Sequence, residues 1–218
     1  MKNVWKAARP VLPSELICGE DLSDTVERVL QDESDVYGYD FNDGTLCGAE
    51  GKVLEFSGCY FHKCVFSELD FGRISFVDCI FDHCELSNLR LTNAAFQRVE
   101  MSHCRMTGLE LLRSILMNVS LKESMMDYLS LSEASLDRVV IHDCHMRESI
   151  WADVKLLKAA FEQADLSRTQ WVRTPLKGMD VSSCTISGWN ISLADLRGVK
   201  VNASQVIELS GLLGIEIV

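Results

Sequence analysis

The chain has 218 residues, of which 21 are basic and 32 acidic, so its net charge is −11 at pH 7. A surface of this charge repels phosphate, which excludes nucleic acid as a direct partner and favours a basic groove on another protein. No apolar run reaches the roughly 18 residues of a transmembrane helix, so no membrane partner is expected. The first residues, Met1–Lys6, also lack the apolar core of a secretory signal.

The first 35 residues form a lead-in that precedes any repeat. Residues 1–14 contain Pro10 and Pro13 and show no period, which indicates irregular structure. Residues 24–32 are expected to form a helix, because Asp24 and Glu27 fit a capping box and Val26 and Leu30 lie one helical turn apart. Such a helix would cap the exposed edge of a repeat that follows it.

Residues 36–201 carry a five-residue period. From Phe56 to Val201 every fifth residue is apolar, thirty times without a slip of register. The residue two places before each of these is small or apolar, and neither place holds Asp, Glu, Lys or Arg. Since charged side chains are rarely buried without a partner, two places of each five point inward and three point outward.

A second period of twenty residues indicates how the units stack. Cysteine recurs in this way at Cys64, Cys84 and Cys104, and tryptophan recurs at Trp151 and Trp171. Four units therefore make one coil, and successive coils stack at strand spacing, which gives about 8.3 coils and a rod on the order of 40 Å long. Gly48 and Gly51 indicate an irregular coil or a small loop within residues 42–53, and no insertion interrupts the repeat after Phe56.

Seven of the nine cysteines fall at the small inward place. A free cysteine behaves as a small apolar residue, so we interpret these seven as core filling rather than as a disulfide framework. Buried reduced thiols indicate a cytoplasmic protein.

No catalytic motif is found along the chain. The segment Gly48-Ala49-Glu50-Gly51-Lys52 continues with Val53 and so does not form a phosphate-binding loop. The five histidines take outward places, and one column stacks Lys63, His83, His103, Glu123 and Asp143. We interpret this column as a solvated mixed-charge face in preference to a metal site on His83, His103 and Glu123. No catalytic, cofactor-binding or metal-binding residue is therefore predicted, and an enzyme is not expected.

The C-terminal segment, residues 202–218, departs from the repeat. Asn202 can cap a short helix that carries Val206, Leu209 and Leu213 on one side, and Ile215–Val218 is predicted to be a short strand. The segment either shields the last coil or joins two copies of the chain.

The repeat resembles the pentapeptide-repeat family. The units that match its pattern best are Ala164-Asp165-Leu166-Ser167-Arg168 and Ala194-Asp195-Leu196-Arg197-Gly198. This resemblance implies an all-β fold, a right-handed quadrilateral parallel β-helix, here with short helical caps at both ends.

The C-terminal part, Leu196-Arg197-Gly198-Val199-Lys200-Val201 followed by Leu212-Leu213-Gly214-Ile215-Glu216-Ile217, resembles the quinolone-resistance (Qnr-like) branch of that family. This resemblance implies a dimeric DNA mimic that binds the type II topoisomerases DNA gyrase and topoisomerase IV and protects them from quinolones. An apolar patch would suit the symmetric dimer contact, and its residues are Leu209, Leu212, Leu213, Ile215 and Ile217.

Acidic residues are concentrated in the first half of the chain. Residues 15–85 hold 17 acidic and 4 basic side chains, a net charge of −13, whereas residues 101–218 hold 14 and 12, a net charge of −2. This charge either keeps the solenoid soluble or forms the surface that docks in a basic DNA-binding site. The candidates for partner contact are Glu50, Glu55, Glu68, Asp70, Asp78, Asp82, Glu85, Glu100 and Glu110. The alternative function is a structural or scaffolding solenoid that binds another protein.

Overall fold

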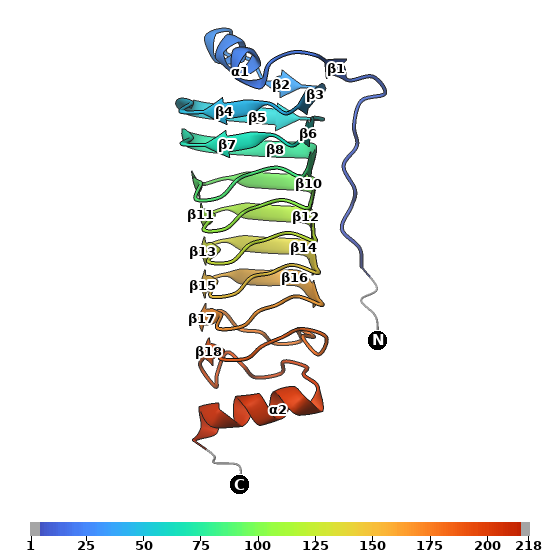
Figure 1. Ribbon diagram of the computed structural model, residues 1–218. Coiled ribbons are helices and arrows are strands. Elements are labelled where there is room, and N and C mark those ends of the chain that lie inside the picture. The colour runs from blue at the N-terminus through green and yellow to red at the C-terminus, as the bar shows by residue number, and fades with distance from the viewer. Residues whose placement is uncertain (1–4, 215–218) are drawn as a thin grey trace.

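The computed structural model describes residues 5–214 as a rod of stacked coils with one helix at each end (Figure 1). The helices are α1 (Leu22–Gln31) and α2 (Ala203–Ser210), and a 3-10 turn, η1 (Gly211–Leu213), follows α2. The strands are β1 (Ile17–Cys18), β2 (Val36–Tyr37), β3 (Tyr39–Asn42), β4 (Thr45–Cys47), β5 (Glu50–Ser57), β6 (Tyr60–His62), β7 (Val65–Ser67), β8 (Asp70–Asp82), β9 (Arg90–Thr92), β10 (Ala95–Ser102), β11 (Glu110–Leu112), β12 (Ile115–Lys122), β13 (Ser130–Ser132), β14 (Ser135–His142), β15 (Ile150–Ala152), β16 (Lys155–Glu162), β17 (Gln170–Val172) and β18 (Asn190–Ile191).

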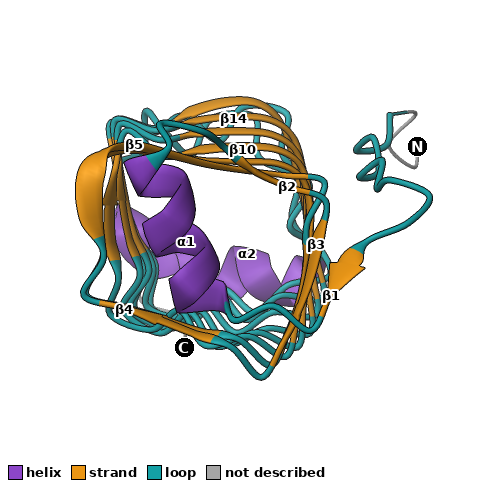
Figure 2. Ribbon diagram, turned by 90° about the horizontal axis from the view of Figure 1, so that it is seen from above, coloured by secondary structure: helices purple, strands orange, loops and turns teal. Residues whose placement is uncertain are grey.

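The strands pair in parallel, and from β2 onward nearly every paired residue lies twenty places along the chain, whereas β1 pairs with β3 at a separation of twenty-two. The largest sheet follows the order β1-β3-β6-β8-β10-β12-β14-β16, with β2 and β5 beside it, and a second sheet runs β18-β17-β15-β13-β11-β9. Phe96 pairs with Phe76 and Leu116, and Trp151 pairs with Trp171. Viewed along the rod, the coils trace a four-sided outline (Figure 2). The stacked four-unit coil predicted from the two periods is confirmed, as is the fold class that the family resemblance implies.

Both inward places are buried along the rod. Phe61 and Phe81 stack with ring centroids 4.7 Å apart, and Trp151 and Trp171 stack at 5.0 Å. An internal void of about 20 Å³ between Met101 and Trp151 is lined by apolar side chains only. A void of this size holds at most about one water, so the rod is a packed core and not a channel.

The corners of the coil use a backbone conformation that the apolar pattern does not reveal. The residue two places after each central residue repeatedly has a positive φ, for example 56° at His83, 52° at Arg98 and 57° at Asn118. For a residue other than glycine this conformation costs roughly 1–2 kcal/mol. The corner amides recover part of that cost by bonding to the next coil, as in the 3.0 Å bond from the His83 amide to the Ser102 carbonyl.

Helix α1 caps the first coil, but its start differs from the prediction. The N-cap is Asp21, whose side chain accepts a hydrogen bond from the Asp24 amide, so the predicted capping box of Asp24 and Glu27 is wrong. The helix begins earlier because Leu22 belongs to its buried face, together with Val26 and Val29.

Residues 42–53 contain no loop, contrary to the interpretation of Gly48 and Gly51. Strands β4 and β5 occupy this stretch, and Gly51 pairs in register with Phe71. A Cβ atom at Gly51 would lie 3.0 Å from Cε1 of Phe71. The glycine therefore makes room for the Phe71 ring, and the ladder continues through it.

Helix α2 closes the other end of the rod, as predicted. Asn202 and Gln205 form its capping box. The Gln205 side chain is buried, and its Nε2 donates to the carbonyls of Val181 and Cys184 at 2.9 and 2.7 Å. The Val181 carbonyl also accepts from the Cys184 amide at 2.9 Å, so Gln205 adds a second donor there and supplies a donor to the Cys184 carbonyl. Among residues 5–214, no helix is long and apolar enough to cross a membrane.

The cysteines are all free thiols, and the seven at inward places are buried. Several of the thiols donate to a carbonyl of the preceding coil, as Cys84 does to Phe61 at 3.3 Å. The interpretation of these cysteines as core filling is confirmed.

Candidate functional site: an acidic end and an N-terminal arm

The nine acidic candidates do not form a single face, because their places in the coil differ. Glu50, Asp70 and Glu110 share one column along the rod, on β5, β8 and β11, with Glu68 two residues before Asp70. Asp82 and Glu100 lie on the face that β8 and β10 present on another side. Asp78 occupies a corner with φ of 53°, and Glu55 and Glu85 lie on the remaining sides.

Five of the nine already have partners within the chain. Arg98 Nε donates to Asp78 at 2.6 Å, and Arg90 Nε donates to Glu110 at 3.3 Å. The other three are engaged as follows: Asp82 contacts His62 and His83, Glu85 accepts from the Ser87 amide at 2.8 Å, and Glu100 lies 3.9 Å from Arg9.

These partners shift the ionisation of two of the carboxyls. The hydrogen bond from Arg98 holds the pKa of Asp78 below its usual range. Burial opposes the same effect at Asp82, yet the hydrogen bonds from His83 and His103 still lower the pKa of that carboxyl. Both groups are therefore ionised at neutral pH, with their charge largely directed to neighbouring side chains.

The four remaining carboxylates define what we call the acidic end: Glu50, Glu55, Glu68 and Asp70. Within residues 5–214 none of the four makes an ion pair. Glu50 and Asp70 face each other in register on β5 and β8. Like charges directly opposite each other are destabilising in a sheet, so this pair raises the free energy of the isolated rod. Glu85 makes no ion pair either, but its carboxylate accepts from the Ser87 amide, so the acidic end comprises the candidates with neither kind of partner among the described residues.

The N-terminal arm, residues 5–13, is a feature that the sequence did not predict. It runs back along the outside of the rod instead of ending near the first coil (Figure 1). The Ala8 amide donates to Asn118 at 3.2 Å, and the Val11 amide donates to Asp78 at 3.0 Å. The arm therefore spans several coils, held by backbone donors and one ion pair.

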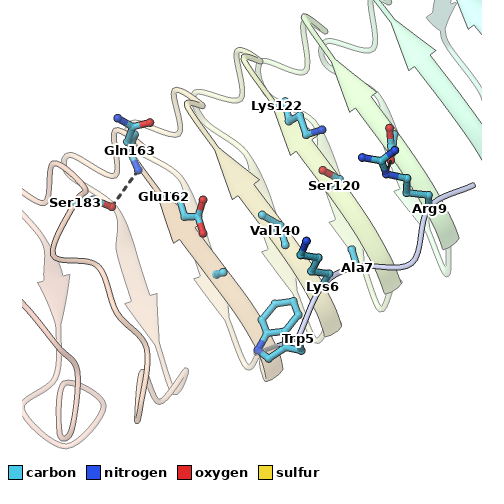
Figure 3. Close-up of a pocket in the computed structure, with 12 residues that line it drawn as sticks. Trp5, Lys6, Ala7, Arg9, Ser120, Lys122, Val140, Glu162, Gln163 and Ser183 are labelled. Atoms are coloured by element: carbon cyan, nitrogen blue, oxygen red, sulfur yellow. Dashed lines mark hydrogen bonds and ion pairs between the residues drawn. The ribbon is translucent and has the colours of Figure 1, made fainter. Parts of the chain in front are cut away.

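A groove of about 790 Å³ lies between the arm and the rod. In Figure 3 Trp5, Lys6 and Ala7 lie over the strands that carry Ser120 and Val140. Val140 and Ala160 are apolar residues at an outward place, where the repeat otherwise prefers polar side chains. In the sequence, these outward apolar residues were the feature from which a covering segment on this face could have been predicted.

The predicted dimerisation residues fall into three groups. Leu209 and Leu212 are partly buried and pack against the core of their own rod. Leu213 is 59% exposed, and the neighbouring Val206 and Ile207 are also exposed. Ile215 and Ile217, like the predicted strand Ile215–Val218, lie outside the described residues.

Two family descriptions match the chain. The pentapeptide repeat region matches residues 94–171, and the eight-copy pentapeptide repeats match residues 70–108. The chain carries pentapeptide repeats. The resemblance drawn from the five-residue pattern is therefore confirmed over these residues. No curated protein sequence matches the chain significantly.

Solved pentapeptide-repeat structures are similar along most of the rod. Full-length QnrB1, a plasmid-mediated fluoroquinolone resistance protein, is 19% identical with a TM-score of 0.33, covering 81% of this chain and 99% of its own. HetL, a pentapeptide repeat protein involved in heterocyst differentiation regulation in Nostoc sp. strain PCC 7120, is 13% identical with a TM-score of 0.37, covering 84% and 95%. Rfr23 from Cyanothece 51142 is 13% identical with a TM-score of 0.26, covering 82% and 99%. At these values the similarity assigns no partner to this chain.

Proposed function

We propose that this protein is a non-enzymatic, cytoplasmic DNA mimic that binds a type II topoisomerase, DNA gyrase or topoisomerase IV, and protects it from quinolones. In this proposal the acidic end enters the basic site where the topoisomerase binds the DNA backbone. No nucleic acid or membrane takes part in the contact.

The observation that carries the proposal is the unpaired charge of the acidic end. Carboxylates that repel each other lower stability and gain a compensating partner only when a basic surface docks on them. A topoisomerase must present such a surface, because DNA binding depends on neutralising phosphates. The rod supports the charges on a rigid, packed core, so little conformational entropy is lost on binding.

The proposed dimer uses the exposed apolar residues beyond the last coil. Among the predicted dimer residues that the structure describes, Leu213 is the most exposed to solvent. Val206 and Ile207 extend this apolar patch onto α2. Leu209 and Leu212 contribute mainly to capping, because they already pack against the rod. A symmetric contact between two copies would bury the patch on both.

The test measures supercoiling by purified gyrase in the presence of ciprofloxacin, with and without the full-length protein. Two variants, each raising the net charge by four, separate a specific site from general charge. The first neutralises the acidic end: Glu50→Gln, Glu55→Gln, Glu68→Gln and Asp70→Asn. The second neutralises exposed carboxylates elsewhere: Glu133→Gln, Asp143→Asn, Glu162→Gln and Glu208→Gln.

We expect the wild type and the second variant to restore supercoiling, the first variant to fail, and rising salt to weaken binding. Absence of both rescue and binding at low salt would refute the proposal. A pull-down that instead recovers a different stable partner would support the alternative, a structural or scaffolding solenoid.

A further inference from the structure

Three imidazoles converge on one carboxylate at the edge of the face that carries β8 and β10. His62 Nδ1 lies 3.0 Å from Asp82 Oδ2, and His83 Nδ1 lies 2.9 Å from Asp82 Oδ1. His103 Nδ1 points to the same Oδ1 at 3.4 Å. The coil creates this cluster, because residues 62 and 82 pair in neighbouring strands and residues 83 and 103 occupy successive corners.

The ligand atoms of His62, Asp82 and His83 all lie within 4.8 Å of one another. Zinc binds imidazole nitrogen and carboxylate oxygen at about 2.0–2.2 Å, so two ligand atoms of one ion lie at most about 4 Å apart. The cluster is therefore close to coordination distance before any adjustment. Its histidines are partly exposed, with 28% of the His62 side chain and 51% of the His83 side chain accessible, so small rotations and entry of an ion are possible.

The ring of His103 lies between two carboxylates. Its Nε2 lies 3.1 Å from Glu123 Oε2, while its Nδ1 faces Asp82. A neutral imidazole has one N–H, so it can donate to only one of these carboxylates. With the proton on Nε2, the Nδ1 lone pair faces Asp82, where a metal ion could be ligated by both groups.

The Glu123 contact also has the form found around bound metals. A histidine that ligates a metal through one nitrogen commonly donates its other N–H to a carboxylate, which fixes the ring and raises its basicity. The Ser102 hydroxyl lies 3.2 Å from Asp82 Oδ1 and orients that carboxylate from the side. The rings of His83 and His103 are stacked 4.6 Å apart at 16°, so their Nδ1 atoms point the same way.

We propose that His62, Asp82 and His83, with His103 oriented by Glu123, form a binding site for a divalent transition-metal ion of the first row. Zn²⁺ is the ion by which we test it. The donor set of imidazole nitrogen and carboxylate oxygen matches the preference of such ions. A bound ion links three successive coils and so stabilises the first half of the rod. The column Lys63, His83, His103, Glu123 and Asp143 alone did not reveal this site, because His62 and Asp82 come from the neighbouring column.

The test uses the full-length chain with Cys18→Ser and Cys47→Ser as background, since these two exposed thiols would also bind zinc. After removal of metals with EDTA, calorimetric titration with ZnCl₂ is expected to show one ion per chain and a rise in melting temperature. His83→Ala should weaken binding at least about tenfold, and Glu123→Gln should weaken it by roughly 10- to 100-fold. The matched control is His145→Ala, which removes another exposed histidine and should leave binding unchanged.

Binding that is equally strong in His83→Ala, or lost equally in His145→Ala, would overturn the proposal. Nitrogen-15 NMR of the imidazoles provides an independent readout. Imidazole signals of His62, His83 and His103 that do not respond to ZnCl₂ would refute the metal site. Circular dichroism checks that each variant is folded.

Discussion

Replacing Phe81 with alanine tests the packed core of the coil at one of its most enclosed points. The Phe81 side chain is completely buried. Its ring stacks on Phe61 at 4.7 Å and meets Phe76 edge-on at 5.2 Å. The substitution removes the ring from a site where both the coil before it and its own coil depend on the contact.

The expected loss follows from the area of the ring. A phenylalanine buries on the order of 200 Å², which at about 25 cal/mol per Å² gives at most about 5 kcal/mol of hydrophobic stabilisation. Alanine retains one methyl group and leaves a cavity, so a loss of about 3–5 kcal/mol in the free energy of unfolding is expected. Phe81→Asp should cost several kcal/mol, because it buries a charge without a partner.

Urea unfolding followed by circular dichroism measures this loss. Each coil contacts only its neighbours, so hydrogen exchange should show the loss of protection concentrated in the coils around residue 81. Tyr128→Ala is the control, because Tyr128 is 57% exposed at a corner and its loss should change stability by about 0.5 kcal/mol or less. A loss below about 1 kcal/mol for Phe81→Ala, or an equal loss in the control, would refute the inward assignment.

Three further predictions concern charge, thiols and assembly. Arg98 lowers the pKa of the 15% exposed Asp78 carboxyl, so this group adds stability above its unfolded pKa of about 3.9, and that stability is lost as the pH falls through the lower folded pKa. Asp78→Asn should therefore lower the free energy of unfolding by about 1–3 kcal/mol at pH 7, with the difference from wild type shrinking toward pH 2 in urea titrations; a constant difference would contradict this. Titration with a thiol reagent should find Cys18 and Cys47 reactive in the native protein and the other seven reactive only after unfolding, because the packed core shields them from the reagent. At Cys144 burial also raises the pKa of the thiol to about 11. Nine reactive thiols at once would contradict the packing. Leu213→Glu should convert the proposed dimer to a monomer in analytical ultracentrifugation without lowering the melting temperature, and an unchanged mass would count against the proposed interface.

The core could be predicted from the sequence because burial acts on one side chain at a time. An apolar residue at every fifth place, such as Phe56 or Phe81, must face inward wherever the chain turns, and the twenty-residue columns then give the number of sides. The corner backbone could not be predicted in this way. Arg98 and Arg113 are unusual residues for a positive φ, and their conformation is imposed by bonds between coils and not by local preference.

The N-terminal arm illustrates a second limit. Its extended residues have no period, and its contacts join Ala8 to Asn118 and Val11 to Asp78, across 110 and 67 positions of the chain. The apolar outward residues Val140 and Ala160 line the groove beneath it, but Ile115 and Leu157 are outward apolar residues that stay exposed, so this signal does not by itself locate the arm. A periodic sequence therefore specifies its own stacking well, while a non-periodic segment finds its place through contacts that the repeat does not encode.

The charge of the surface has to be judged column by column, because the coil turns a separation of twenty residues into contact. The net charge of −13 over residues 15–85 suggested a broad acidic face, yet Asp78 is matched by Arg98 and Asp82 by His62 one coil away. The residues twenty places before and after Glu68 are Gly48 and Asn88. Neither carries a charge, so neither neutralises Glu68.

Glu50 and Asp70 are each other's neighbours, and the next residue of their column, Arg90, is directed to Glu110. The carboxylates available to a basic partner are thus those whose neighbours at a distance of twenty residues cannot neutralise them. The acidic end meets this criterion. Glu100 meets it as well, with Ile80 and Ser120 in its column, and is excluded only because Arg9 of the N-terminal arm lies 3.9 Å away. The total charge alone therefore overstates the surface that a partner can use.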